Sequence, residues 1–280
     1  MGSAQAQDTG LSGVNLYNDR MAIDSFGFLN VNSPEFNEQG DWYLKLSEDF
    51  RANHLLNLSI NGVSQDVVES AMTTNFLISK TLTDFFAVAL DVPLHFWLQE
   101  RNVNTGQEFT TSAAGDMRLA TKFRLVTEGK LHPGLALLTA MTLPSGDEGK
   151  FMGDNWVVPN AELIIGKDLG YIDIFVNIGA SFPSQTTVAG IDFDDRVSAT
   201  LGLNMPLYFI NETWAIVAQA HGSFQPKNIQ TVTSPLAILG GVTKSFNNGL
   251  QIEAAAGGSL TNAVGNARVH AFVSLGYAPN

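Results

Sequence analysis

The sequence predicts an all-β fold, a transmembrane antiparallel β-barrel of about twelve strands with short periplasmic turns and longer extracellular loops. From residue 41 onward, extended segments with alternating apolar and polar residues follow one another. Charged residues make up 15% of the chain, against about 25% in soluble domains. No window holds about 18 consecutive apolar residues, which excludes a membrane helix and leaves a barrel as the membrane-spanning alternative.

The expected strands have about 9 to 15 residues, the length of tilted membrane-spanning strands. The first of them, "WYLKLSEDFRANHLLNLSI", is compatible with one long, kinked strand or with two short ones. The even count brings both ends of the barrel region to the same side of the membrane. The expected ranges are 41–60, 66–80, 84–98, 115–127, 131–142, 156–166, 171–182, 193–206, 212–224, 235–246, 250–261 and 267–277.

Alternation within these segments separates two faces. In "DFFAVALDVPLHFWL", Phe86 and every second residue up to Leu98 form one apolar face. In a barrel this face meets lipid, and a terminal aromatic such as Tyr277 lies at the periplasmic interface. The residues expected to face lipid include Phe86, Val88, Leu90, Phe96, Phe123, Ile174, Val176, Val273, Leu275 and Tyr277.

The opposite faces carry the charges. An Arg or Lys on the lipid face costs about 2–4 kcal/mol near the membrane midplane, so these side chains are expected to point into the lumen. There they line an aqueous path or close the lumen as a salt-bridge network, and the sequence leaves both possibilities open. The residues expected to face the lumen are Asp91, His95, Asp116, Arg118, Lys122, Arg124, Asp173, Glu253, Arg268 and His270.

The connections differ in length between the two ends of the predicted barrel. Connections such as "TLTD", "TEGK" and "FNNG" are short, and Asn248-Gly249 is a strong hairpin signal. Connections such as "QERNVNTGQEFTTSAAG" and "PSGDEGKFMGDN" are longer and polar. Outer-membrane barrels have short turns in the periplasm and long loops outside, so the sorting predicts this location in a Gram-negative bacterium.

Residues 1–40 precede the repeated strands. The start "MGSAQAQDTG" resembles an expression tag followed by the end of a secretory signal. The rest has poor periodicity and is expected to form a periplasmic arm, while residues 41–280 form the barrel. Three placements of the arm remain open, since its residues fit a plug in the lumen, a segment below the barrel or a clamp on a neighbouring subunit.

Composition and motifs exclude several functions. The net charge of -12 argues against a nucleic-acid partner, because such proteins concentrate positive charge. The chain has no Cys, its five His are scattered, and no nucleophile motif such as G-x-S-x-G is present. We therefore expect no enzyme activity, no cofactor and no metal site. The acidic loop residues Asp147, Glu148 and Asp154 fit a solvated loop better than a cation site.

The stretch "GDMRLATKFRLV…GLALLTAMTLPSGDEGKFMGDNWVVPNAELIIG" resembles porin-like outer-membrane barrels of predatory and related bacteria, some of which are fused to OmpA-like domains. In that family a "GD-R-K-R" strand is followed by "TLPSGD" and a second "GD". The resemblance covers about residues 20–277, with "AIDSF" and "DWYLKL" near its start. It implies a twelve-stranded barrel that assembles into pentameric rings and holds lipid in a central space.

Three functions are compatible with these observations. The resemblance favours a homo-oligomeric ring, pentameric as in that family, whose partner is outer-membrane lipid. The polar inward faces favour the alternative, a passive diffusion channel for small solutes. A soluble all-β binding module is the third, although it leaves the low charge and the sorted loops unexplained.

Overall fold

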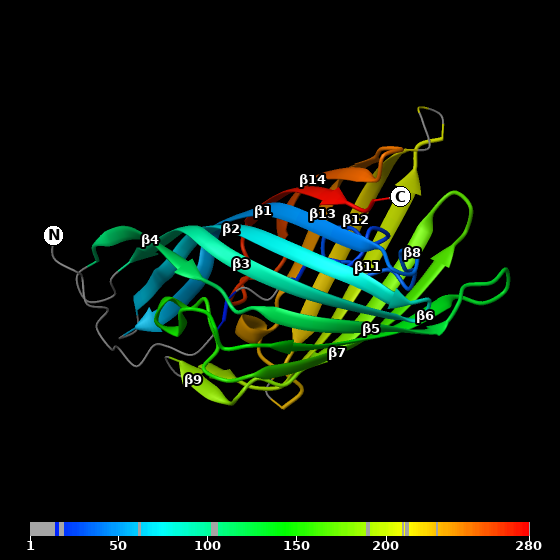
Figure 1. The fold of residues 1–280 in the computed structure, drawn as a ribbon. Helices are drawn as coiled ribbons and strands as arrows, with labels where there is room; N and C mark the ends of the chain where they lie inside the picture. Colours follow the sequence, from blue (N-terminus) through cyan, green and yellow to red (C-terminus); the bar gives the residue numbers. More distant parts are fainter. Residues whose placement is uncertain are drawn as a thin grey trace.

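The computed structural model describes residues 15–16, 20–60, 63–101, 106–188, 191–208, 210, 213–227 and 229–279. They form a closed antiparallel barrel (Figure 1), which confirms the prediction of twelve strands. β1 closes the ring by pairing with the last strand, from Leu44 opposite Tyr277 to Ala52 opposite Val269. The barrel strands are β1 (Trp42–Ile60), β2 (Val63–Thr83), β3 (Phe86–Arg101), β5 (Arg118–Val126), β6 (Gly134–Thr142), β7 (Val158–Asp168), β8 (Asp173–Ser181), β11 (Arg196–Pro206), β12 (Trp214–Phe224), β13 (Leu236–Ser245), β14 (Leu250–Ser259) and β15 (Val269–Tyr277).

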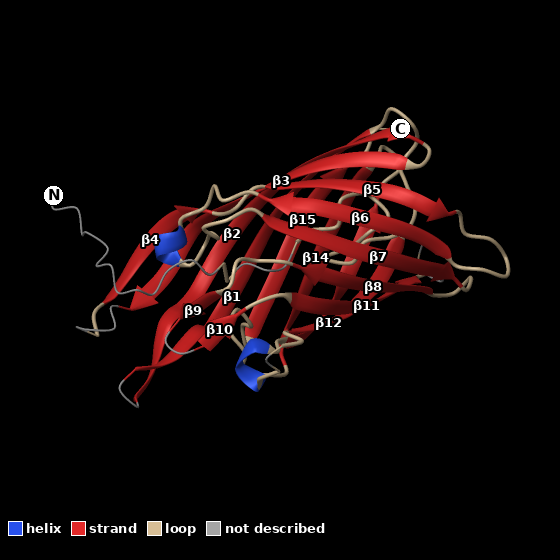
Figure 2. Ribbon diagram, turned by 90° about the horizontal axis from the view of Figure 1, so that it is seen from below, coloured by secondary structure: helices blue, strands red, loops and turns tan. Residues whose placement is uncertain are grey.

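β1 and β2 are longer than a membrane crossing requires, with 19 and 21 residues against about 9–11. The pairing of β1 with β2 shifts register between Ala52 and Leu56, and Asn53 has a φ of 67°, so β1 is one kinked strand. Short strands and short helices lie in the longer connections, at the long-loop end of the barrel (Figure 2). They are β4 (Glu108–Ala114), β9 (Thr186–Val188), β10 (Ile191–Phe193) and the 3-10 helices η1 (Glu148–Lys150) and η2 (Thr231–Thr233). The helices within the described ranges are too short to cross a membrane.

The barrel exterior is apolar between two rims of aromatic residues. Along β15, Val269, Val273, Leu275 and Tyr277 are exposed, whereas His270, Phe272 and Ser274 are buried. Exposed aromatics occur at both strand ends, as expected for membrane interfaces. Trp42, Phe85, Tyr171, Tyr208, Trp214, Phe246 and Tyr277 lie at the short-turn end, and Phe96, Trp156, Phe182 and Phe224 lie toward the long-loop end.

Alternation predicts side-chain orientation wrongly at two places. Leu98 is fully buried although alternation from Phe86 placed it outside. The pairing of β3 with β2 shifts near this point, so Trp97 turns outward and stacks on Phe50 at 6.1 Å. Arg268 is exposed rather than inside, because β15 begins at Val269, two residues later than expected, and the Arg268 side chain donates to the Oδ1 atom of Asn262.

The described part of the N-terminal arm lies inside the barrel, which corrects its assignment as a periplasmic arm. Leu16 packs at the long-loop end against Leu98 and Phe151. Pro34 contacts the glycines of β6 and β7 near the short-turn end, and the Gly40 N–H donates to the Thr81 carbonyl. Of the three placements left open, the structure has the plug. Residues 1–14 and 17–19 lie outside the described ranges.

Candidate functional site: a lumen divided by the N-terminal arm

A tight hairpin of the arm crosses the middle of the lumen. The N–H groups of Phe28 and Val31 each donate to the other residue's carbonyl, at 3.1 and 2.8 Å, and Leu29 between them has a φ of 47°. The side chains of Phe28, Leu29 and Val31 are buried among Phe175 of β8, Val217 and other inward residues. We call residues 28–32 the plug hairpin.

Gly202 of β11 lets the plug hairpin approach the barrel wall. A Cβ atom at this position would lie 2.5 Å from Cγ1 of Val31, closer than real contacts allow. The hairpin also receives polar support, since the Asn30 N–H donates to Oε1 of Gln219 at 3.3 Å. The absence of a side chain at Gly202 therefore provides the space that Val31 fills.

Glu162 of β7 fastens the other side of the plug hairpin. Its Oε1 atom accepts hydrogen bonds from the side-chain amides of Asn32, at 2.8 Å, and Asn177, at 3.0 Å. Asn177 also donates to the Asn32 carbonyl at 3.1 Å. A carboxylate that accepts two amide donors holds them more strongly than a neutral acceptor does.

Two cavities lie on either side of the plug hairpin. The first, of about 150 Å³, opens toward the long-loop end and is lined by Thr142, Ser181 and Arg196 among others. The second, of about 940 Å³, is lined by residues of the short-turn end such as Asp168 and Pro206. Since outer-membrane barrels carry their long loops outside, we refer to the extracellular and the periplasmic cavity.

A buried ion pair ties the arm to the wall next to the plug hairpin. Nζ of Lys122 contacts Oδ2 of Asp24 and the Glu35 carbonyl, and it lies 4.4 Å from the centre of the Phe36 ring. Oδ1 of Asp24 also accepts the Phe26 and Gly27 N–H groups, both at 3.0 Å. The arm thus enters the plug hairpin from a turn fixed by a charged side chain.

Replacing Lys122 by Met is expected to weaken the docking of the arm. The change leaves the Asp24 carboxylate buried without its cation, which costs about 3–5 kcal/mol. Replacing Asp24 by Asn as well should recover part of that loss, so a double-mutant cycle on thermal unfolding measures the coupling. The exposed pair of Lys227 with Asp195, at 3.1 Å, is the control and should show a much smaller coupling, because solvent screens exposed charges. Equal couplings for the two pairs would contradict this account.

Asp116, in the connection before β5, joins the arm to the extracellular loop of residues 143–157. Oδ1 accepts the Ser145 and Gly146 N–H groups at 3.1 and 2.8 Å. Oδ2 accepts Nδ2 of Asn15 at 3.1 Å and the Asp154 N–H at 2.7 Å. Asp116 belongs to the first "GD" motif, Ser145 and Gly146 to "TLPSGD" and Asp154 to the second "GD". The three motifs, which are separate in the sequence, therefore meet in the structure at the Asp116 carboxylate.

Glycine is required at this junction. A Cβ at Gly146 would lie 2.4 Å from the Met152 carbonyl oxygen, and one at Gly153 would lie 2.7 Å from the carbonyl carbon of Gly146. Both contacts are with backbone, so neither can be relieved by moving a side chain. The loop backbone consequently closes around the Asp116 carboxylate.

The loop residue Asp154 has a raised pKa of about 6, because burial disfavours its charged form and Asp116 repels it, against the opposing effect of Arg196 and Arg20. The folded state then binds a proton more tightly than the unfolded state does. The free energy of unfolding should fall as pH rises from about 4 to about 6, and this part of the loss persists above pH 6.

The variant Asp154→Asn is expected to remove this pH dependence. Thermal unfolding at pH 5 and pH 8 should show a smaller difference for the variant than for the wild type, because Asn does not titrate. The control is Asp147→Asn in the same loop, whose carboxylate pairs at the surface with Lys150 at 3.2 Å. A pH response that is identical in wild type and Asp154→Asn would contradict the raised pKa.

A network of charged and polar side chains fills the opposite wall of the lumen. Nζ of Lys45 lies 2.7 Å from Oε2 of Glu253. Asp49 accepts two hydrogen bonds from Arg51, at 3.0 and 2.9 Å, and its Oδ1 lies 3.0 Å from Nε2 of His270. Salt bridges thus join β14, β15 and β1 across the lumen wall, while the extracellular cavity lies along β5 to β12.

The remaining predicted lumen residues lie inside the barrel as well. Asp91 is buried, and His95 hydrogen-bonds Oγ1 of Thr73 at 2.7 Å. Arg124 lies 3.7 Å from a Glu35 carboxylate oxygen, and Asp173 accepts from Asn204 at 2.8 Å. Among the described residues, no group of three or more His, Asp or Glu side chains is arranged to hold a metal ion.

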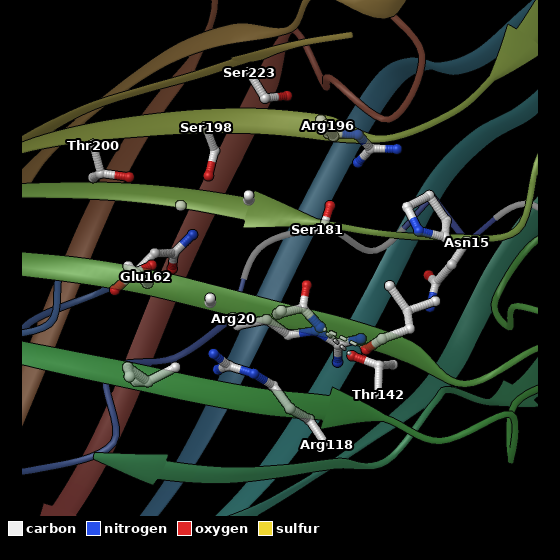
Figure 3. Close-up of a pocket in the computed structure, with 18 of the residues that line it drawn as sticks. Asn15, Arg20, Arg118, Thr142, Glu162, Ser181, Arg196, Ser198, Thr200 and Ser223 are labelled. Atoms are coloured by element: carbon white, nitrogen blue, oxygen red, sulfur yellow. Dashed lines mark hydrogen bonds between the residues drawn. The ribbon is translucent and has the colours of Figure 1, made fainter. Parts of the chain in front are cut away.

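Arginines from three elements line the extracellular cavity (Figure 3). Arg20 belongs to the arm, Arg118 to β5 and Arg196 to β11. Arg20 also donates to the Asp116 carbonyl at 3.3 Å. The sequence analysis identified Arg118 but missed Arg20 and Arg196. Arg196 stands at the start of an expected strand, and inward alternation from Ser198 was the signal available for it.

Comparisons with known proteins place this fold. No family model matches the chain, and no curated protein does, so the resemblance to a particular family remains a prediction. Among solved structures, the COG4313 outer membrane channel from Pseudomonas putida F1 matches with a TM-score of 0.68, at 13% identity over 87% of this chain and 97% of that chain. The NanC porin matches with a TM-score of 0.56, at 6% identity over 85% of this chain and 99% of that chain.

At these identities the likeness concerns the fold alone. It agrees with the closed ring of strands, the apolar exterior and the two aromatic rims described above. Barrels with these features span the bacterial outer membrane. The chain is therefore a β-barrel protein of the Gram-negative outer membrane.

Proposed function

We propose that this protein is an outer-membrane channel for small polar solutes, in which the plug hairpin divides the pathway. One observation carries the proposal. Cavities open at both ends of the lumen, one lined by strands from β5 to β12 and the other by strands from β7 to β14, and the plug hairpin lies between them. Solutes pass when the plug hairpin leaves the wall at Gly202 and Glu162, joining the two cavities. The channel descriptions of the two matching structures are consistent with this use of the fold.

Bilayer electrophysiology tests the proposal. The purified protein should produce current steps in planar lipid membranes. Replacing Arg118 by Glu should shift ion selectivity toward cations, because the pathway passes this side chain. The control is Arg101→Glu, which changes the same charge at the exposed ion pair with Glu108 at the end of β3. Electrical silence of the wild type and of a plug-hairpin variant together would contradict the channel function.

A homo-oligomeric ring that organises lipid remains the second candidate, and one observation favours it. A groove of about 590 Å³ runs over the outer face of β11 to β14. The small residues Ala218, Gly240, Ala256 and Gly258 help to line it and leave it open. An acyl chain or a neighbouring subunit fits such a surface. Native mass spectrometry of the detergent-extracted protein tests this candidate. A multimer with additional lipid mass supports the ring, and a monomer without lipid contradicts it.

A further inference from the structure

Positive charge is concentrated in the extracellular cavity. Arg20, Arg118 and Arg196 line it together with the carboxylates of Asp154 and Glu162, so guanidinium groups outnumber carboxylates. The Oε1 atom of Glu162 already accepts hydrogen bonds from Asn32 of the plug hairpin and from Asn177. The excess positive charge favours an anion in the cavity. A chain with a net charge of -12 repels anions elsewhere on its surface, so this local positive charge would direct anions to the cavity.

Arg118 supplies the second observation. Its side chain is 5% exposed and lines the cavity, yet its Nη1 atom makes no hydrogen bond to any described residue. A buried donor without a partner is unfavourable, because it has given up its hydrogen bonds to water without replacing them. A guanidinium group presents its donors as a fork that matches a carboxylate, so a carboxylate in the cavity would satisfy this atom.

The wall beside the arginines is rich in hydroxyl groups. Ser181 lies opposite Arg196 in the pairing of β8 with β11, and Ser198 lies opposite Ser223 in the pairing of β11 with β12. All three serines line the cavity (Figure 3). Hydroxyl groups both donate and accept hydrogen bonds, so they suit a ligand that carries hydroxyl groups itself.

The size of the cavity limits the ligand. Its volume of about 150 Å³ holds on the order of ten water molecules, at about 10–15 Å³ each. A single sugar ring has a comparable number of heavy atoms, whereas a longer oligosaccharide exceeds the space. Gly179 contributes to this volume, since a Cβ there would lie 2.8 Å from the Ser198 hydroxyl oxygen.

We propose that the extracellular cavity binds a small hydroxylated carboxylate of the sugar-acid class, with Arg118 on the carboxylate, and with Arg196 and the serines on the hydroxyl groups. The proposal rests on the proposed function, since it describes the solute that the channel selects. The site lies before the plug hairpin on the way inward. It therefore concentrates the anion where the pathway is closed.

Isothermal titration calorimetry of the full chain in detergent tests the site with three probes. D-glucuronate is expected to bind at least tenfold more tightly than D-glucose, which lacks the carboxylate, and than acetate, which lacks the hydroxyl groups. Equal binding of glucose would overturn the role of the arginines. Equal binding of acetate would overturn the role of the serines.

Variants distinguish the site from a general effect of charge. Arg118→Gln and Arg196→Gln should each weaken glucuronate binding at least tenfold, whereas Arg101→Gln at the barrel rim should leave it unchanged. Because Arg118 is buried, Arg118→Lys provides a second variant that keeps the charge and loses the fork, and it should also weaken binding. Each variant is first checked for the shift in gel mobility on heating that a folded barrel shows. Unchanged affinity in folded Arg118→Lys and Arg196→Gln would overturn the site.

Conductance separates the two proposals. If the protein conducts but does not bind glucuronate, the channel function is supported and the binding site is contradicted. If it binds glucuronate but no variant conducts, the binding site is supported and the channel function is contradicted. Glucuronate that blocks the current of the wild type, with at least a tenfold weaker block in Arg196→Gln, supports both.

Discussion

Truncating the plug hairpin is expected to raise single-channel conductance several-fold. The combined change Phe28→Gly, Leu29→Gly and Val31→Ala keeps the chain length and removes the apolar side chains that fill the middle of the lumen. Phe28 packs edge-on against Phe175 at 5.9 Å, and Val31 fills the space at Gly202. Removing buried side chains of this size costs about 2–5 kcal/mol each, enough to release the hairpin from the wall. The two cavities then join.

The matched control is Phe26→Gly, which removes an aromatic ring from the same arm at a position that is 49% exposed. This change should leave the conductance near that of the wild type. Planar-bilayer recordings of the three proteins measure the effect. If the conductance rose equally in the control and the truncated variant, the cause would be a loosened arm rather than loss of the plug hairpin. No increase in either would mean that the hairpin does not close the pathway.

Replacing Asp116 by Ala is expected to have the largest effect on stability, a loss of about 3–5 kcal/mol in the free energy of unfolding. The carboxylate accepts hydrogen bonds from Asn15, Ser145, Gly146 and Asp154, and the side chain is fully buried. Truncation leaves these donors without their acceptor, and hydrogen bonds to a charged group are the stronger kind. The junction of Asp116 with the arm and with the loop of residues 143–157 should therefore open before the strands separate.

Limited proteolysis and thermal unfolding measure this prediction together. Asp116→Ala should expose the loop of residues 143–157 to cleavage at a temperature at which the wild type is resistant. Asp147→Ala in the same loop is the control, because its carboxylate pairs with Lys150 at the surface, where such pairs contribute below about 1 kcal/mol. Equal unfolding temperatures for Asp116→Ala and Asp147→Ala would contradict the junction.

The barrel was predictable because its pattern is local. Alternation with a period of two places a residue such as Leu275 outside and Ser274 inside without reference to the rest of the chain. The rule failed where the backbone leaves the regular strand. A register shift turned Leu98 inward, and the late start of β15 left Arg268 at the surface.

The candidate site was less predictable because it depends on contacts between distant segments. Asp24 reaches Lys122 across 98 positions, and Asn32 reaches Glu162 across 130. No periodicity marks an irregular arm as a plug, so its placement stayed open. The polar motifs around Asp116 carried a signal through their resemblance to a family. Their physical role appears only when the loops meet.

The central claim is that the plug hairpin must leave the wall for solutes to pass, and a disulfide lock tests it most directly. The chain has no Cys, so Val31→Cys with Gly202→Cys introduces one possible pair at positions whose side chains would touch. Bilayer current is recorded from the oxidised protein and again after reduction with dithiothreitol. We expect silence when the lock is closed and wild-type current when it is open. Equal current before and after a verified reduction would contradict the claim.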